Sequence, residues 1–217
     1  MLSRMIQSQY RDKVPEWFFE QLIAHTQNFS HVTWLGQPVW QNVFDLWIMQ
    51  ETIAEVKPAL LIETGTHRGG SALFFANLFD LLGQGQVISI DIELRDPIGH
   101  PRITLLTGSS IAPEIVETVR SRALAGGPIM VTLDSDHSRD HVAAELEAYA
   151  PLVTPGSFCL VQDGVIDTLD ALAGGRPGPL PAIEAFLKTH PEFELDVARS
   201  QKFLISHHPK GWLRRIR

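Results

Sequence analysis

The stretch Leu60-Leu-Ile-Glu-Thr-Gly-Thr-His-Arg-Gly-Gly-Ser71 decides how this chain is expected to fold. Its three leading apolar residues predict a short buried strand, and the apolar pattern of Gly70–Leu82 predicts a helix after the turn. An acidic residue closes the strand, and the glycines let the backbone turn tightly against a ligand. His67 occupies the middle glycine position of the dinucleotide fingerprint, which excludes that motif. The N-terminus of the following helix still offers a place for an anionic group such as a carboxylate.

The same alternation of short apolar runs and longer helical runs continues to the end of the chain. Further strands are expected at Val87–Ile90, Ile103–Leu106, Ile129–Leu133 and Phe158–Val161, and a closing pair at Glu194–Val197 and Phe203–Ser206. Helices are expected at Pro113–Leu124, from a Ser138 cap to about Tyr149, and up to about His190. Alternating βα units with apolar strands predict an α/β fold with a doubly wound, mostly parallel sheet of seven strands.

The first part of the chain has a different pattern. It holds four of the five tryptophans and little β-pattern, with helices expected near Trp17–Gln27 and Val43–Glu55. We therefore predict an N-terminal helical appendage, residues 1–56, on a main domain, residues 57–217. The tryptophans of the appendage either line a substrate pocket or pack it onto the main domain or a second subunit. They are Trp17, Trp34, Trp40 and Trp47.

Composition excludes several classes of function. The 217 residues are 44% apolar and carry a formal net charge of −7, so general binding of nucleic acid or of an anionic membrane surface is not expected. No apolar run reaches the ~18 residues needed for a membrane span, and the N-terminus lacks the apolar core of a signal peptide. The single cysteine, Cys159, lies in an apolar run and excludes an internal disulfide. A cytoplasmic setting is therefore expected.

Polar residues follow two further strands, where ligands of parallel sheets bind. Asp91 ends the second strand and suits a ribose diol, because one carboxylate accepts two hydroxyl hydrogen bonds. The third strand runs into Thr107-Gly108-Ser109-Ser110, small polar residues suited to the edge of an adenine. Each feature alone is also compatible with an ordinary turn and helix cap. Together with the glycine turn they favour a nucleoside pocket.

Carboxylates follow the next two strands. Asp134 ends the fourth strand, and Gln162 and Asp163 end the fifth. Neighbouring parallel strands bring the two carboxylates together, and a hard divalent cation with oxygen ligands, Mg²⁺ above all, would relieve their repulsion. His137 stands three residues after Asp134 and suits the role of general base. Asp136 is either a weaker alternative ligand or, like Asp140 and His141, a surface group.

These residues together resemble class I methyltransferases that use S-adenosylmethionine. More closely, the chain resembles the family of cephalosporin hydroxylase-named proteins and rhamnosyl O-methyltransferases. Five stretches carry that likeness: Trp34-Leu-Gly-Gln-Pro38, Ile62-Glu-Thr-Gly-Thr-His-Arg-Gly-Gly-Ser71, Leu133-Asp-Ser-Asp-His-Ser138, Val161-Gln-Asp-Gly164 and His208-Pro-Lys-Gly-Trp-Leu213. The resemblance implies a Rossmann-like methyltransferase sheet that holds S-adenosylmethionine through Glu63, Gly65, Thr66, Ser71, Asp91, Gly108, Ser109, Ser110 and Asp134.

A more distant likeness to catechol and macrolide-sugar O-methyltransferases implies the metal site. The corresponding positions are Asp134, Gln162 and Asp163 for the metal, and His137 for the base. Gln162 departs from the acid usual at its position. The implied protein is an enzyme: an S-adenosylmethionine- and Mg²⁺-dependent O-methyltransferase, acting on a hydroxyl of a sugar, glycolipid or natural product. We expect a small-molecule acceptor and a homo-oligomer.

Three other functions compete with this interpretation. Asp134-Ser-Asp136 has the Asp-x-Asp pattern of a metal-dependent glycosyltransferase. The hydroxylase label of the family suggests an iron enzyme, although that chemistry usually needs two histidines and one carboxylate. A non-catalytic cofactor-binding protein is the third. The roles of His207, His208 and Trp212 stay open, and Gly174–Pro181 is either a mobile lid or a plain loop.

Overall fold

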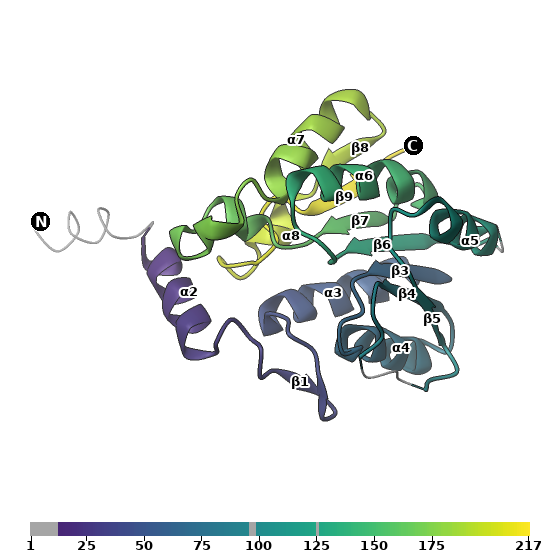
Figure 1. Cartoon of the computed structure of the whole chain (residues 1–217), viewed down its shortest axis with the longest axis horizontal. Coiled ribbons are helices and arrows are strands. Elements are labelled where there is room, and N and C mark those ends of the chain that lie inside the picture. The colour runs from purple at the N-terminus through teal and green to yellow at the C-terminus, as the bar shows by residue number, and fades with distance from the viewer. Residues whose placement is uncertain (1–12, 96–98, 125) are drawn as a thin grey trace, which may run out of the picture.

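A computed structural model describes residues 13–95, 99–124 and 126–217 (Figure 1). Seven strands form one sheet in the order β5-β4-β3-β6-β7-β9-β8. The first five run parallel, whereas β9 is antiparallel to both of its neighbours. The strands are β3 (Leu60–Thr64), β4 (Gln86–Asp91), β5 (Ile103–Thr107), β6 (Ile129–Leu133), β7 (Phe158–Val161), β8 (Phe193–Leu195) and β9 (Trp212–Arg215). The predicted mostly parallel α/β sheet is confirmed.

Helices cover both faces of the sheet (Figure 1). One face packs on α5 (Pro113–Ala123), α6 (Arg139–Tyr149) and α7 (Pro179–Thr189), and the other on α3 (Val43–Val56) and α4 (Gly70–Leu82). Alternate residues of β3 supply the two cores: Leu60 and Ile62 face the first, and Leu61 faces the second. A strand buried on both faces needs apolar residues throughout, and the run Leu60–Ile62 meets that need.

The N-terminal part contributes to two separate cores. Phe19 and Ile23 of α2 (Val14–His25) pack in a third apolar cluster with Val165 and Leu169. The helix α3, in contrast, buries its apolar side in the core of the main sheet. The division after residue 56 stays a prediction, and its first 12 residues lie outside the described part of the chain. The small hairpin between the two helices consists of β1 (Thr33–Trp34) and β2 (Gln37–Pro38).

The four N-terminal tryptophans have different environments. Trp34 packs edge-on against Phe74 of α4, and its Nε1 donates to Asn77 at 2.9 Å. Trp40 lines the large cavity described below. Trp17 and Trp47 expose about half of their surface, 50% and 57%. Both proposed roles, lining a pocket and packing onto the main domain, therefore occur, but in different residues.

The prediction of the last two strands was wrong in part. The segment Phe203–Ser206 is not a strand; β9 lies at Trp212–Arg215, and the expected strand at Glu194–Val197 is β8, which ends at Leu195 before α8 (Val197–Gln201). Leu204 has a φ of +66° and is 76% exposed, which no central strand tolerates. The following residues, up to His208, form a loop rather than a strand.

The Gly- and Pro-rich segment is shorter than expected. The 3₁₀ helix η3 (Asp170–Gly175) includes its first two residues, and α7 begins at Pro179. Both oxygens of Asp167, in the 3₁₀ helix η2 (Gly164–Asp167), accept backbone N–H groups, from Gly178 at 2.7 Å and from Leu180 at 2.8 Å. The role of the segment Gly174–Pro181 as a lid stays a prediction. Among the described helices none has the length and apolar character that crossing a membrane requires.

Candidate active site

A cavity of about 680 Å³ lies at the carboxyl ends of the parallel strands. That volume is typical of a small-molecule site, and the position is where parallel sheets bind ligands. The turns after β3, β4, β5, β6 and β7 all contribute to its wall. Of the predicted site residues, these line it: Gly65, Thr66, Ser71, Asp91, Gly108, Ser109, Ser110, Asp134, His137 and Asp163.

Gly65 joins the turn after β3 to the turn after β6. Its φ is +89°, and a Cβ added there would lie 1.9 Å from the backbone oxygen of Asp134. The N–H of Asp134 in turn donates to the carbonyl of Thr64 at 3.0 Å. Only glycine permits this approach, so the nucleoside-type turn and the acidic strand end meet in one place.

Glu63 lies beneath the glycine turn and not in the cavity wall. It is fully buried, and Ser89 donates to its Oε2 and is also 2.6 Å from the Thr66 hydroxyl. The other carboxylate oxygen, Oε1, has no partner among the described residues. Burial raises the pKa of Glu63 to about 7, and hydrogen bonds from Ser71 and Ser89 oppose the rise. The geometry supports a role in holding the turn, and direct cofactor contact by Glu63 stays a prediction.

The raised pKa of Glu63 predicts a pH-dependent stability. A carboxyl that is more basic when folded than when unfolded destabilises the fold as pH rises from about 4.5 to 7. Glu63→Gln cannot ionise, so its free energy of unfolding relative to wild type should increase by about 2 kcal/mol between pH 5 and pH 8. Urea unfolding of both proteins at each pH measures this. A difference that does not change with pH would contradict the buried position.

The predicted nucleoside residues lie together in the cavity wall. Asp91 accepts the N–H of His67 at 2.7 Å and that of Glu93 at 3.1 Å, which fixes the orientation of its carboxylate. After β5, Ser110 is buried, and its Oγ is 3.1 Å from Nε2 of His141. The strand ends thus place the acid and the small polar residues on one cavity.

His141 is a wall residue that the sequence analysis left among possible surface groups. Its Nε2 is 3.5 Å from Oε1 of the buried Glu145, one helical turn further along α6. The hydrogen bond that the imidazolium of His141 donates to Glu145 is the main cause that raises the pKa of His141. The His–Glu spacing of four residues was the available signal, because it places both side chains on one helix face.

The acidic residues after β6 and β7 form one cluster with His137. Nε2 of His137 is 3.4 Å from Asp163 and 3.9 Å from Asp134, and ligand atoms of the three residues all lie within 4.8 Å of one another. The pKa of Asp134 is raised well above its usual value, first by burial and then by the neighbouring charge of Asp163. A divalent cation would relieve both effects, so the donors fit a hard metal ion.

Two glutamines near this cluster, Gln162 and Gln41, have different hydrogen-bond partners. Gln162 is buried, does not line the cavity, and donates from Nε2 to Thr132 at 2.9 Å. Its role as a metal ligand stays a prediction. Gln41, which the sequence analysis did not select, lies just before α3 and donates to Oδ2 of Asp134 at 2.7 Å. Its only sequence signal was its position close to the Trp34–Pro38 stretch.

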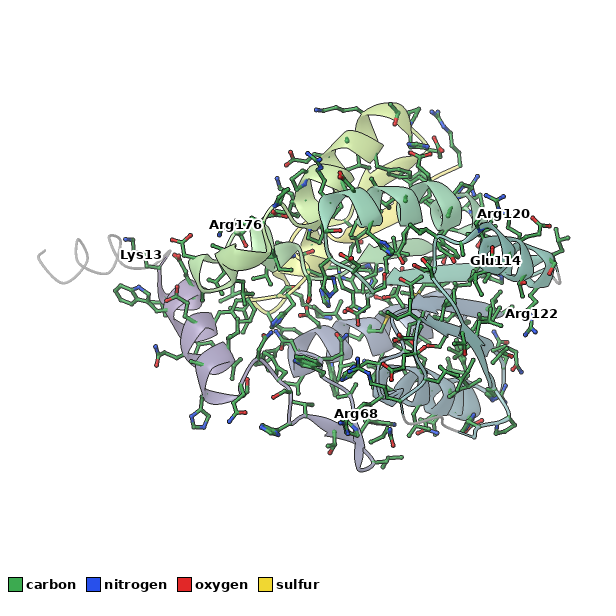
Figure 2. All side chains as sticks on the ribbon, in the orientation of Figure 1. Lys13, Arg68, Glu114, Arg120, Arg122 and Arg176 are labelled. Carbon is green, nitrogen blue, oxygen red and sulfur yellow. The ribbon has the colours of Figure 1, made fainter. Side chains whose placement is uncertain are left out.

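The remaining wall is mostly uncharged. It comes from the segment after α2, from the segment before α3, from η2 and η3, and from the loop before β9; its residues include Asn28, Phe29, Trp40, Ile166, Leu172 and His207. Among the described wall residues only Arg68 carries a permanent positive charge. Figure 2 shows Arg68 beside the β1–β2 hairpin, where its carbonyl accepts from Gln37. The wall thus offers aromatic and apolar surface with few charges.

Comparison with known proteins identifies similar sequences along most of the chain. The family model "Rhamnosyl O-methyltransferase/CmcI" matches residues 26–216. Rhamnosyl O-methyltransferase of Mycobacterium leprae (strain TN) is 36% identical over 204 residues, which covers 91% of this chain and 87% of the relative. The protein of that name from Mycobacterium tuberculosis (strain H37Rv) is 35% identical over 205 residues, covering 91% and 82%.

Solved structures share the fold. A CmcI chain described with Mg and SAM has a TM-score of 0.69 at 22% sequence identity, and covers 88% of this chain and 78% of that one. MycE, a methyltransferase of mycinamycin biosynthesis described in complex with Mg, SAH and mycinamycin VI, has a TM-score of 0.51 at 19% identity. At these identities the likeness concerns the fold alone.

Proposed function

The chain belongs to the rhamnosyl O-methyltransferase/CmcI family, and we propose that it transfers a methyl group from S-adenosylmethionine to a hydroxyl of a sugar, glycolipid or other natural product, with Mg²⁺ as cofactor. The observation that carries the proposal is the cluster of Asp134, His137 and Asp163 on the same cavity as the glycine turn after β3. A site for a nucleoside cosubstrate and a site for a cation therefore share one space of about 680 Å³.

Asp134 and Asp163 are the residues that would hold Mg²⁺. Both supply carboxylate oxygens, which this cation prefers, and the high pKa of Asp134 indicates that the pair lacks compensating positive charge. Gln162 would have to turn its side-chain amide away from Thr132 to join them. When bound, the cation lowers the pKa of a hydroxyl group through its Lewis acidity.

His137 is positioned to remove the proton of the acceptor hydroxyl. Its Nε2 faces the two carboxylates, and Asp163 at 3.4 Å stabilises the imidazolium that forms when Nε2 takes the proton. The glycine turn and the small residues after β5 orient the methyl donor, and the apolar wall excludes water from the acceptor. The chain's own contribution is thus orientation of two substrates and the transfer of one proton.

The wall favours an uncharged acceptor that carries a ring. Trp40, Phe29 and Leu172 offer aromatic and apolar surface, and Asn28 and His207 offer polar groups beside it. Such a combination suits a glycosyl group, whose ring has apolar faces and hydroxyl edges. The relatives named rhamnosyl O-methyltransferase support the same class of acceptor.

Chelation tests the role of the cation. Methyl transfer from labelled S-adenosylmethionine to a panel of rhamnosides and other glycosides should fall to background in EDTA and return with excess Mg²⁺. Binding of S-adenosylhomocysteine, measured by calorimetry in the same buffer, reports whether the fold survives chelation. Full turnover in EDTA would contradict the cation site, and no turnover on any acceptor in Mg²⁺ would favour a non-catalytic binding protein.

The two other candidate functions lose their structural support. The glycosyltransferase pattern needs Asp134 and Asp136 on one metal, but Asp136 is outside the cluster and its Oδ1 accepts the N–H of Ser138 at 2.8 Å. An iron hydroxylase needs two histidines, and within the described residues only His137 joins the two carboxylates. No observation favours either function over methyl transfer.

We also propose that the protein is a cytoplasmic homo-oligomer. Half-exposed aromatic residues on α2 and α3, among them Phe18 and Trp47, offer apolar surface to a second copy. The one cysteine, Cys159, is free and buried, which suits a reducing compartment. Light scattering coupled to size-exclusion chromatography determines the number of subunits, and a mass near 24.2 kDa would contradict the oligomer.

A further inference from the structure

The histidine pair His207–His208 connects α3 to the end of β7 through one buried carboxylate. Oδ1 of Asp45 accepts the Ser206 hydroxyl at 2.6 Å, and its Oδ2 accepts the backbone N–H of His207 at 2.8 Å. The same Oδ2 is 3.8 Å from Nε2 of His208, and both side chains are almost completely buried. Asp45 therefore fixes the position of the loop and faces the outer edge of the His208 ring.

The opposite edge of that ring faces the metal-ligand candidate Asp163. The backbone N–H of Asp163 donates to Nδ1 of His208 at 3.1 Å, so Nδ1 is an acceptor and a neutral ring carries its proton on Nε2. Asp163 has a φ of +57°, in the left-handed region that a residue with a side chain adopts only when its surroundings hold it there. The His208 bond is one contact that holds it.

Backbone contacts hold this loop against the end of β7 on both sides of Asp163. Val165 donates to the carbonyl of His207 at 3.0 Å, and Val161 donates to that of Gly211 at 2.9 Å. A Cβ on Gly211 would lie 2.1 Å from the Val161 oxygen, so this approach requires glycine. These backbone contacts therefore fix the segment that contains His208 against the end of β7.

Gln162 borders the same small space as Asp45 and His208. A small cavity of about 10 Å³, the space of about one water, lies among buried residues that include Asp45, Gln162 and His208. The Oε1 atom of Gln162 is buried without a partner in the described structure. One water there would accept the Nε2 proton of His208 and donate to Asp45 and to Gln162, which spans the 3.8 Å gap between the ring and the carboxylate.

We propose that His208 is a positioning residue for the cation site: its ring, held by Asp45 and one enclosed water, fixes the backbone of Asp163 so that the carboxylate faces Asp134 and His137. The proposal rests on the proposed function only for the identity of the cation. The proposal also gives Gln162 the role of supporting this ring. That role accounts for an amide at position 162, where the metal-dependent methyltransferases that the chain resembles usually have an acid.

Wild-type protein gives the first test. Long-range ¹H–¹⁵N spectra of ¹⁵N-histidine-labelled protein distinguish the two neutral imidazole tautomers, and we expect the signal of His208, identified by its loss in His208→Asn, to show a proton on Nε2. A proton on Nδ1 would overturn the proposal, because Nδ1 could not then accept the Asp163 N–H.

Cation binding gives the second test, measured by Mg²⁺ calorimetry on protein saturated with S-adenosylhomocysteine. His208→Leu fills the space without an acceptor and should weaken Mg²⁺ binding by about 10-fold or more, as loss of an outer-shell partner does in other metal sites. The amide oxygen of His208→Asn reaches the Nδ1 position and should keep the affinity within about threefold. If His208→Leu does not fold, His208→Gln, whose amide lies further out, replaces it.

Ser200→Ala is the matched control. It removes the 2.9 Å hydrogen bond from Ser200 to the carbonyl of His208 but leaves the ring in place, so Mg²⁺ affinity should stay within about twofold. Equal losses in Ser200→Ala and His208→Leu, or unchanged affinity in His208→Leu, would overturn the positioning role alone. A wild-type protein that binds S-adenosylhomocysteine but no Mg²⁺ would overturn the proposed cation site, and this proposal with it.

Discussion

Replacing His137 with alanine is expected to lower kcat by about 10²- to 10⁴-fold, the range over which a positioned general base acts. Nε2 of His137 faces both carboxylates of the cluster, at 3.4 Å from Asp163 and 3.9 Å from Asp134. Loss of the ring removes the group that takes the proton of the acceptor hydroxyl, and leaves the residues predicted to hold S-adenosylmethionine unchanged. The affinity for S-adenosylhomocysteine should therefore stay within about threefold.

The same variant separates a base from a metal ligand. If His137 is the base, Mg²⁺ affinity of His137→Ala changes little while kcat falls, and the residual rate increases at high pH, where the acceptor hydroxyl loses its proton without help. If His137 binds the cation directly, Mg²⁺ affinity falls in parallel with kcat. Calorimetry with Mg²⁺ and a methyl-transfer assay on one preparation distinguish these results. Wild-type kcat in His137→Ala would contradict both roles.

Asp163→Asn should abolish Mg²⁺-dependent turnover and weaken Mg²⁺ binding by about 100-fold, because one of two carboxylates of a hard-cation site is lost. Asparagine keeps the backbone N–H that His208 accepts, so the loop should keep its position. A neutral residue 163 also removes the charge that, after burial, does most to raise the pKa of Asp134. The pKa of Asp134 should therefore fall in this variant.

The raised pKa of Asp134 also makes wild-type Mg²⁺ binding pH-dependent. The cation competes with a proton on that carboxyl, so affinity should rise with pH, and it should do so less steeply in Asp163→Asn. Calorimetry at several pH values measures both slopes. Asp140→Asn is the control, since Asp140 is an exposed acid of α6 that pairs with Arg139 and does not line the cavity. Similar losses of Mg²⁺ affinity in Asp163→Asn and Asp140→Asn would show a general effect of charge and would contradict the cation site.

The sequence predicts the parts of this molecule that depend on local pattern. The strands at Ile129–Leu133 and Phe158–Val161 and the helix at Gly70–Leu82 have the predicted bounds, because an apolar run between turn residues determines each of them locally. The strand predicted at Phe203–Ser206 failed because a distant residue competes: Asp45, 161 residues before Ser206, accepts the Ser206 hydroxyl and the backbone N–H of His207 and so holds this segment as a loop.

The residues of the candidate site likewise differ in whether local sequence pattern predicts them. Residues at the end of a strand or just after it, such as Asp91 and Asp163, could be placed on the cavity from sequence, because parallel strands all end at one edge of the sheet. Gln41 and His141 contact it from a segment before a helix and from a helix face, and no strand end indicates them. The side-chain direction of Gln162 depends on its hydrogen bond to Thr132, which adjacency to Asp163 does not reveal.

The long separation between Asp45 and its partners has a consequence for how the protein is made. Synthesis produces Asp45 of α3 first, and its two donors, Ser206 and His207, follow 161 and 162 residues later. Until then the Asp45 carboxylate has no donors, and the cation-side loop beside Asp163 is unsupported. A nascent chain can thus assemble the strands of its cosubstrate half first, and it completes the cation side only after Ser206 and His207 have been synthesised. A change at Ser206 or His207 would therefore act on an interior carboxylate that was synthesised long before it.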